Sequence, residues 1–529
     1  MQPESQTGPG IVGATASALA AKIASGAITA LEAVEAHIAR IEDVNPRLNA
    51  VVVKRYAEAR AEAEDADRRR ASGERLGVLH GVPVTVKECL DMAGTPSTYG
   101  LAAHAQRTAT SDDPYVARLR AAGAIVLGKT NVAQLLMSIE CYNPVYGRTN
   151  NPWNLERSPG GSSGGEAAIV AAGGSPLGIG TDIGGSCRVP AAFCGIVGFK
   201  PTQGRTPDQG RRSIPFGERA IASQAGVLAR SVEDVVLGLR VIAGAPPEDL
   251  EPPVPLADYR SVDVAALRVA VYEDDGVFPP APAARRAVRE AAQILTASGA
   301  TVSAWTPPEI HLAAELFYGL LTSDRGRGLS ALLRGEKTDP NIGPLLMTAK
   351  QSRRGIAAMG ALLRALGQRR TAETIAPFGY GDTHRYWQRV EELHDHRRRF
   401  FDALDRASGG PFDVILCPPC ALPAFTHGAA RDLGLPGTYS YLPNVLGLPA
   451  GVVPLTRVRA DEEGARAASR DAVERTAARV ERGSAGLPVG VQLIARPWRE
   501  DVALAAMRTI ESVARERADY PRTSDSSLG

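Results

Sequence analysis

Two serines and a lysine occur in sequence contexts that favour acyl-transfer chemistry without histidine. Ser162 and Ser186 lie in separate glycine-rich turns of the segment SPGGSSGGEAAIVAAGGSPLGIGTDIGGSCRVP (158–190), and Lys87 lies in the apolar run GVPVTVKE. A serine hydroxyl is a weak nucleophile near neutral pH, so a base must accept its proton and donors must stabilise the carbonyl oxygen as it becomes negative. Glycine has no Cβ, so the TDIGGS turn can direct several N–H groups at one point beside Ser186. The predicted donors are the amides of Ile183, Gly184, Gly185 and Ser186.

Lys87 can serve as the base only when its amine is neutral, and the reference pKa of lysine is about 10.4. We expect burial between apolar strand residues such as Val84 and Val86, helped by a nearby cation such as Arg188, to lower this pKa. Neutral Lys87 then takes a proton from Ser162, and Ser162 takes the proton of Ser186. The relay returns the proton to the leaving amine, and water hydrolyses the acyl-enzyme. No metal and no organic cofactor is required.

The segments GGSSGG (160–165) and GTDIGGSCRVP (180–190) resemble the hallmark of the amidase signature family. Further segments, among them SIECYNPVYGRTNNPW, SYLPNVLGLPAGVVPLT and GLPVGVQLIARPW, are similar to its fatty-acid amide hydrolase branch, so the resemblance runs from about Gly81 to Ile510. It implies that Ser186 is the nucleophile, that Lys87 is the base, and that Ser162 follows a cis peptide bond and bridges the two. It also implies an oxyanion hole over residues 183–186, an α/β/α sandwich and a homodimer. Supporting roles are expected for Gly161, Ser163, Asp182 and Arg188.

Each feature taken alone has a simpler explanation. A lysine in an apolar strand is usually an edge residue that reaches solvent, and serines between glycines are typical of flexible turns. GGSSG also matches the G-x-S-x-G elbow of α/β-hydrolases, but the preceding NNPWNLERSP predicts a loop where that elbow requires a strand. The glycines of this region do not complete a dinucleotide fingerprint, and no phosphate-binding loop motif occurs. The joint pattern of the two serine turns and the lysine therefore favours catalysis.

Apolar runs that alternate with helical patterns predict an α/β fold. An amphipathic helical start extends from about Thr15 to Ile41, is interrupted by Gly26, and is followed by a helix to about Arg70. The later runs are GVPVTVKE, GAIVLGKT, VDVAALRVAVYE, FDVILCPP, LPAGVVPLT and LPVGVQLIARP. We expect a mixed central sheet flanked by helices. The predicted organisation is a helical lead-in over 1–70, a catalytic domain over 71–515 and a tail over 516–529.

Composition is that of a large globular enzyme and excludes several classes of partner. The chain has 529 residues, 44% of them hydrophobic, enough for an extended core. A net charge of +2 gives no electrostatic argument for nucleic acid. Six cysteines without a secretion signal indicate a reducing cytoplasm, and the N-terminus carries no run of about 20 apolar residues that would span a membrane.

Two segments are candidates for contact with a lipophilic substrate. Leu136, Met137 and Ile139 immediately precede ECYNP, and their apolar side chains suit an acyl or aryl group. The basic segment 344–370 sets Ile356, Met359, Leu363 and Leu366 on one helical face. Such a helix binds a membrane interface, covers the mouth of an apolar acyl channel, or packs as an ordinary core helix.

The sequence therefore predicts a serine amidase that acts on lipophilic acyl or aryl amides. Esters and carbamates present a similar carbonyl to Ser186, so both remain open as substrates. The alternative is the amidase subunit of a tRNA-dependent amidotransferase, which needs partner subunits. A noncatalytic scaffold would be expected to have lost part of the reactive set, and Lys87, Ser162 and Ser186 are all present.

Overall fold

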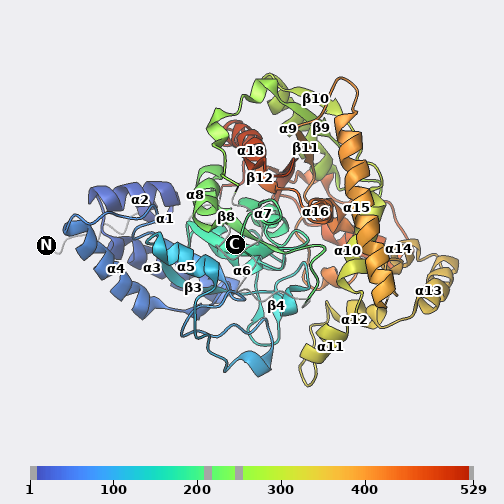
Figure 1. The fold of residues 1–529 in the computed structure, drawn as a ribbon, viewed down its shortest axis with the longest axis horizontal. Helices are drawn as coiled ribbons and strands as arrows, with labels where there is room; N and C mark the ends of the chain where they lie inside the picture. Colours follow the sequence, from blue (N-terminus) through green and yellow to red (C-terminus); the bar gives the residue numbers. More distant parts are fainter. Residues whose placement is uncertain (1–8, 208–216, 245–253, 380, 523–529) are drawn as a thin grey trace.

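The apolar runs of the sequence form one large mixed β-sheet (Figure 1). The computed structural model describes residues 9–207, 217–244, 254–379 and 381–522, and within these ranges the sheet has 11 strands in the order β1-β3-β2-β6-β8-β7-β12-β13-β11-β9-β10. Pairing is parallel along β3-β2-β6 and β11-β9-β10, and antiparallel across the centre. The strands are β1 (Val51–Lys54), β2 (Pro83–Lys87), β3 (Ile125–Thr130), β6 (Leu177–Asp182), β7 (Val197–Lys200), β8 (Gln224–Ala229), β9 (Arg268–Val271), β10 (Thr301–Ala304), β11 (Val414–Cys417), β12 (Ala450–Arg457) and β13 (Pro488–Ala495).

Helices flank this sheet, so the predicted α/β class is confirmed. Helices α6 and α7 contact each other and the central strands, while α8, α18 and α9 form a second contiguous group on the sheet. A separate short hairpin joins β4 (Tyr142–Asn143) to β5 (Gly147–Arg148). The helices are α1 (Pro9–Val12), α2 (Ala16–Ser25), α3 (Ala30–Leu48), α4 (Tyr56–Ala71), α5 (Pro114–Ala121), α6 (Gly164–Ala171), α7 (Arg188–Cys194), α8 (Val232–Ile242), α9 (Pro282–Ala297), α10 (Ile310–Leu321), α11 (Arg327–Leu332), α12 (Gly343–Ala349), α13 (Arg353–Ala365), α14 (Arg369–Ile375), α15 (Thr383–Asp405), α16 (Thr438–Val445), α17 (Ala472–Glu481) and α18 (Glu500–Ala514).

The N-terminal helices lie together at one end of the molecule, at the left of Figure 1. Helices α2 and α3 correspond to the predicted amphipathic start, and Gly26 ends α2 in the left-handed conformation. Between α3 and α4 the chain forms β1, which pairs with β3 at the sheet edge. The predicted lead-in thus contributes a strand as well as helices. Residues 1–8 of that lead-in and residues 523–529 of the predicted tail lie outside the described ranges.

The sheet brings the two signature elements to one edge. Lys87 is the last residue of β2, and Asp182 is the last residue of the neighbouring parallel strand β6. Carboxyl ends of parallel strands lie at the same edge of a sheet, which is where ligands bind in open α/β folds. Ser186 follows β6 by four residues, and Ser162 precedes the start of α6 by two.

The basic segment 344–370 differs from the single amphipathic helix that the sequence predicts. It folds as most of α12, then α13, then the start of α14. Ile356 is buried and Leu363 half-buried on the inner face of α13, whereas Leu366 ends that helix with 63% of its surface exposed. The turns at Lys350–Ser352 and at Gly367 bound α13, so the predicted apolar face is confined to this one helix and its last residue, Leu366, is exposed. Nowhere in the described ranges does a helix combine the length and apolarity needed to cross a bilayer.

Asp234 of α8 fastens the N-terminal helices to the rest of the fold, because its carboxylate accepts hydrogen bonds from the first amides of α2. The distances are 3.0 Å from both Ala16 N and Ser17 N.

Replacement of a residue that caps a helix costs about 1 to 2 kcal/mol. We expect Asp234→Ala to lower the free energy of unfolding in urea by that amount. Asp395→Ala, at an exposed pair with Arg398 within α15, should change it by less than about 0.5 kcal/mol. Equal effects of the two substitutions would contradict the assignment.

Candidate active site

Lys87 lies in direct contact with one of the two signature serines. Its Nζ is 2.8 Å from Ser162 Oγ, 2.9 Å from Thr181 Oγ1 and 3.3 Å from the Thr181 carbonyl oxygen. The lysine is fully buried, and Ser162 is 1% exposed. A neutral amine has two N–H donors and one lone pair, so it can donate to both Thr181 oxygens and accept from the Ser162 hydroxyl. The charged form would donate in all three contacts, so the geometry accommodates both forms of Lys87.

Burial lowers the pKa of Lys87 below its ordinary value, because the charged form loses its hydration. The flanking Val84 and Val86 are buried, as the sequence indicates. The Arg188 guanidinium is paired with Asp182, and the Asp182 carboxylate acts to raise the pKa of Lys87, which offsets the expected help from Arg188. Desolvation is the largest cause of the lowering.

The two serine turns meet through their backbones. The N–H of Ser163 donates to the carbonyl oxygen of Ser186 at 3.2 Å, and the peptide bond between Gly161 and Ser162 is cis. Gly161 packs against backbone of the segment 138–140, where a Cβ on Gly161 would lie 2.4 Å from the Ser138 carbonyl oxygen. Only glycine fits this position, which sets the cis serine against the candidate pocket segment.

A buried ion pair shapes the turn before Ser186. The Asp182 carboxylate accepts from the Gly185 amide at 2.8 Å and from the Cys187 amide at 3.1 Å. The Arg188 guanidinium donates to both of its oxygens, at 3.0 and 2.9 Å. Burial by itself would raise the pKa of Asp182, but the Arg188 charge and these hydrogen bonds hold it well below its usual range.

This arrangement alters the predicted set of oxyanion donors. The Gly185 amide already donates to Asp182. The other members of the set, Ile183, Gly184 and Ser186, line a cavity in the protein. The supporting residues Asp182 and Arg188 therefore lie behind the turn and hold its backbone in shape.

Sequence reasoning missed two polar residues that hold the catalytic segments together. Thr181 directly precedes Asp182 in the signature and contacts Lys87, so its place in the motif was an available signal. The Glu166 carboxyl accepts hydrogen bonds from Thr130, at 2.7 Å, and from Thr85. Burial raises its pKa to about 7 despite these bonds. Glu166 thereby links α6 to β2 and β3, and no local sequence pattern predicts this role.

Ser186 opens onto a cavity of about 420 Å³. The predicted pocket residues Leu136, Met137 and Ile139 line it, together with Gly161. The rest of the wall comes from segments remote in sequence, including Phe317, Leu321, Met347, Ile375, Leu433, Tyr441 and Val473. Most lining side chains are apolar, so the cavity suits a lipophilic group.

An aromatic stack forms the wall beside the oxyanion turn. The rings of Phe317 and Tyr441 lie parallel with centroids 4.3 Å apart. The Tyr318 and Tyr441 hydroxyls are 3.0 Å apart, and Tyr441 also donates to the Gly434 carbonyl oxygen at 3.0 Å. A Cβ on Gly184 would lie 2.5 Å from the Phe317 ring. The turn and the pocket wall are therefore in van der Waals contact.

Comparison with known proteins agrees with this geometry. The sequence profile of the amidase family matches residues 32–504. The chain is 35% identical over 512 residues to fatty-acid amide hydrolase 1 of Sus scrofa, an alignment that covers 93% of this chain and 84% of the relative. It is 34% identical over 495 residues to a glutamyl-tRNA(Gln) amidotransferase subunit of Roseiflexus castenholzii (strain DSM 13941 / HLO8), covering 91% of this chain and 92% of the relative. A solved fatty acid amide hydrolase superposes with a TM-score of 0.81 at 25% identity, over 98% of this chain and 88% of that chain.

The chain belongs to the amidase family, as its signature segments and fold indicate. It is an amidohydrolase, an enzyme that cleaves the carbon–nitrogen bond of amides.

The buried Asp182–Arg188 pair should make a large contribution to stability. Asp182→Asn preserves the shape of the side chain but leaves the Arg188 charge buried without its counter-ion, a change that typically costs about 3 to 5 kcal/mol. We expect a loss of that size in the free energy of unfolding, measured by urea denaturation. Asp65→Asn, which disrupts an exposed pair with Arg68, is the matched control and should cost less than about 1 kcal/mol. A loss at Asp182 no larger than at Asp65 would show that the pair does not hold the turn.

Proposed function

We propose that this amidase is a serine hydrolase with a Ser186–Ser162–Lys87 catalytic triad and an acyl-enzyme intermediate. The observation that carries the proposal is the 2.8 Å contact between the buried Lys87 amine and Ser162, directly behind a cavity that exposes Ser186. Lys87 accepts the proton of Ser162, and Ser162 accepts that of Ser186 as its oxygen attacks the amide carbon. The negative carbonyl oxygen then takes hydrogen bonds from the amides of Ile183, Gly184 and Ser186.

The second half of the reaction reverses the proton path. The proton held by Lys87 passes through Ser162 to the leaving nitrogen, which departs as a neutral amine and leaves the acyl group on Ser186. A water molecule then attacks this ester and gives up its proton to the same relay. The acid is released and Ser186 regains its hydroxyl proton, so the cycle closes without another reagent.

We assign lipophilic acyl or aryl amides as the substrate class. The support is the apolar lining of the cavity, with Leu136, Met137 and Ile139 near Gly161 and the Phe317–Tyr441 stack beside Gly184. Fatty-acid amide hydrolase 1 of Sus scrofa is among the relatives, which is consistent with this class. Esters and carbamates present the same carbonyl to Ser186 and belong to the same test.

The amidase subunit of a tRNA-dependent amidotransferase is the second candidate. The observation in its favour is the 34% identity to the glutamyl-tRNA(Gln) amidotransferase subunit of Roseiflexus castenholzii. Such a subunit needs partner chains, whereas the first candidate acts alone. Activity of the isolated chain separates the two.

Release of p-nitroaniline from acyl anilides of increasing chain length tests both the nucleophile and the pocket. With the purified chain, kcat/KM should rise by up to about fourfold per added methylene, which corresponds to ~0.8 kcal/mol for each methylene buried. Ser186→Ala should lower kcat by at least about 1,000-fold, because the nucleophile is lost. Absence of Ser186-dependent release at every length would favour the amidotransferase subunit, or an ester or carbamate substrate.

The pH profile of the same reaction tests Lys87. Only the neutral amine can accept a proton, so kcat/KM should fall as the pH is lowered through the reduced pKa of Lys87, with a slope of one proton. Lys87→Met should remove this limb and lower kcat/KM by about 100- to 10,000-fold. A residual activity of Lys87→Met that keeps the same acid limb would assign the titration to another group.

A further inference from the structure

Part of the cavity wall is a helical unit with an apolar cluster of its own. Helices α12 and α14 contribute lining residues, among them Met347, Thr371 and Ile375. Between these helices Ala349, Ile356 and Phe378 form a small buried cluster that is separate from the main core and meets it through the half-buried Tyr318. Figure 1 shows α13 and α14 at the right edge of the molecule, away from α7, which begins two residues after Ser186. This unit therefore borders the part of the cavity distant from the nucleophile.

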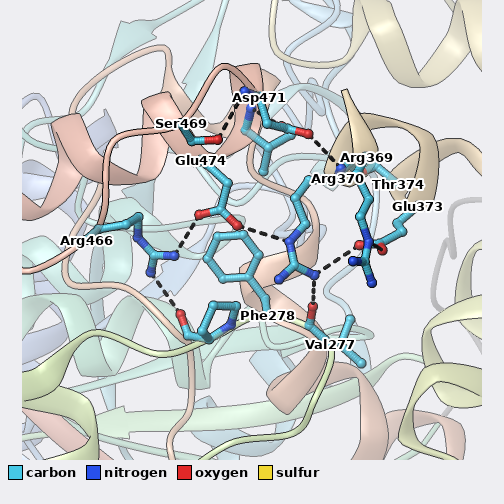
Figure 2. Close-up of polar contacts among 12 residues, drawn as sticks. Val277, Phe278, Arg369, Arg370, Glu373, Thr374, Arg466, Ser469, Asp471 and Glu474 are labelled. Carbon is cyan, nitrogen blue, oxygen red and sulfur yellow. Dashed lines mark hydrogen bonds and ion pairs between the residues drawn. The ribbon is translucent and has the colours of Figure 1, made fainter. Parts of the chain in front are cut away.

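A polar network joins this unit to α17 on the neighbouring wall (Figure 2). Arg370 Nε donates to one Glu474 oxygen at 3.0 Å, and Arg466 Nη1 donates to the other at 2.9 Å. The Arg370 backbone N–H donates to the Asp471 carboxylate at 2.7 Å, which places the first turn of α14 on the start of α17. The Gln368 side chain adds a hydrogen bond from the Ala472 amide at 2.8 Å.

The two arginines share an aromatic partner. Figure 2 shows the Phe278 ring between their side chains, with the Arg466 guanidinium carbon 4.9 Å and that of Arg370 5.6 Å from the ring centroid. Phe278 is fully buried, and Arg370 Nη1 also donates to the Val277 carbonyl oxygen at 2.7 Å. Cations over aromatic faces are attracted by the ring quadrupole, so Phe278 fixes the spacing of the network.

Both helices joined by the network, α14 and α17, carry residues that line the cavity. Arg370 directly precedes the lining residue Thr371, and Glu474 directly follows the lining residue Val473. The side chains of Arg370 and Glu474 are only 22% and 17% exposed, so water screens them less than a surface pair. A displacement of α14 relative to α17 would have to separate these charges.

We propose that Arg370, Glu474 and Arg466, which we call the wall latch, determine the preference of the enzyme for long acyl chains. The latch holds α14 against α17, so that the distal wall of the cavity stays in contact with the end of a long chain. A short acyl group does not reach this wall, so the kinetic constants of its anilide do not depend on the latch. The three residues are positioning residues, and the inference rests on the function proposed above.

Glu474→Gln tests the latch without leaving a charge alone. In this variant Arg370 keeps Glu373 and Arg466 keeps Glu481, so the fold should be retained. We expect KM for a dodecanoyl anilide to rise about five- to tenfold with kcat unchanged, and both constants for an acetyl anilide to stay within about twofold. Arg370→Gln should weaken the same substrate at least as much, because it also removes the contacts of Arg370 with Val277 and Phe278. The double variant should fall short of the sum of the two single effects, because both variants remove the Arg370–Glu474 pair.

Arg369→Gln is the matched control. Arg369 is adjacent in sequence, pairs with Glu373, and has a side chain that is 81% exposed. It should leave the constants for both anilides unchanged. Equal losses on the dodecanoyl and acetyl substrates in Glu474→Gln would indicate a general structural role, and unchanged constants would also overturn the proposal.

Binding of the product acids separates failure of the latch from failure of the proposed function. If the wild-type chain cleaves no anilide, the dissociation constant of dodecanoate, measured by calorimetry, still reports on the distal wall. It should be five- to tenfold weaker for Glu474→Gln and unchanged for Arg369→Gln. Amide hydrogen exchange over residues 369–375 should be faster in Glu474→Gln only. Unaltered dodecanoate affinity and exchange would overturn the latch, whatever the outcome with anilides.

Discussion

The burial of charge beside Ser186 is the constraint on which the site rests. Asp182 and Arg188 are fully buried, and burying two charges is costly unless each meets its partner and further hydrogen bonds. Here the carboxylate meets both the guanidinium and two amides of the turn, and Arg188 also donates to Gln492 and to the Ser440 carbonyl oxygen. Because Gln492 lies on β13 and Ser440 on α16, a single ion pair links the signature turn to two distant parts of the chain.

The same low-dielectric surroundings act on Lys87 in the opposite way. Lys87 has no carboxylate in direct contact; the groups that its Nζ contacts are the Ser162 hydroxyl and the two oxygens of Thr181. Burial therefore lowers the pKa of Lys87. Arg188 instead contacts the Asp182 carboxylate and holds the turn through it, so the two buried basic side chains differ in their partners.

The cavity illustrates how much of the site depends on residues far apart in the chain. The segment 136–139 lies close to Gly161 because that glycine leaves room for the backbone of 138–140. The opposite contributions come from α10, α12, α14, α16 and α17, which the tertiary fold gathers around Ser186. The wall latch belongs to this second group, since Arg370 lies on α14, Glu474 on α17 and Arg466 in the segment before α17.

The sequence by itself determined the family of the chain and the class of the fold. Glycine spacing around Ser162 and Ser186, and the apolar runs that became β2, β3, β9, β11, β12 and β13, are local properties that the linear pattern reveals. The strands β6, β7 and β8 at the sheet centre were not predicted, because glycines in LGIGTD and QAGVLA weaken the strand pattern while neighbouring strands supply the packing. Tertiary structure alone decided that the Gly185 amide donates a hydrogen bond to Asp182 and that burial is the largest cause of the lowered pKa of Lys87. It also decided that 344–370 divides into separate helices and that Phe317 and Tyr441 border the turn. The physical reason is that hydrogen-bond partners, burial and cavity walls are set by groups distant in sequence, and no periodicity or motif records them.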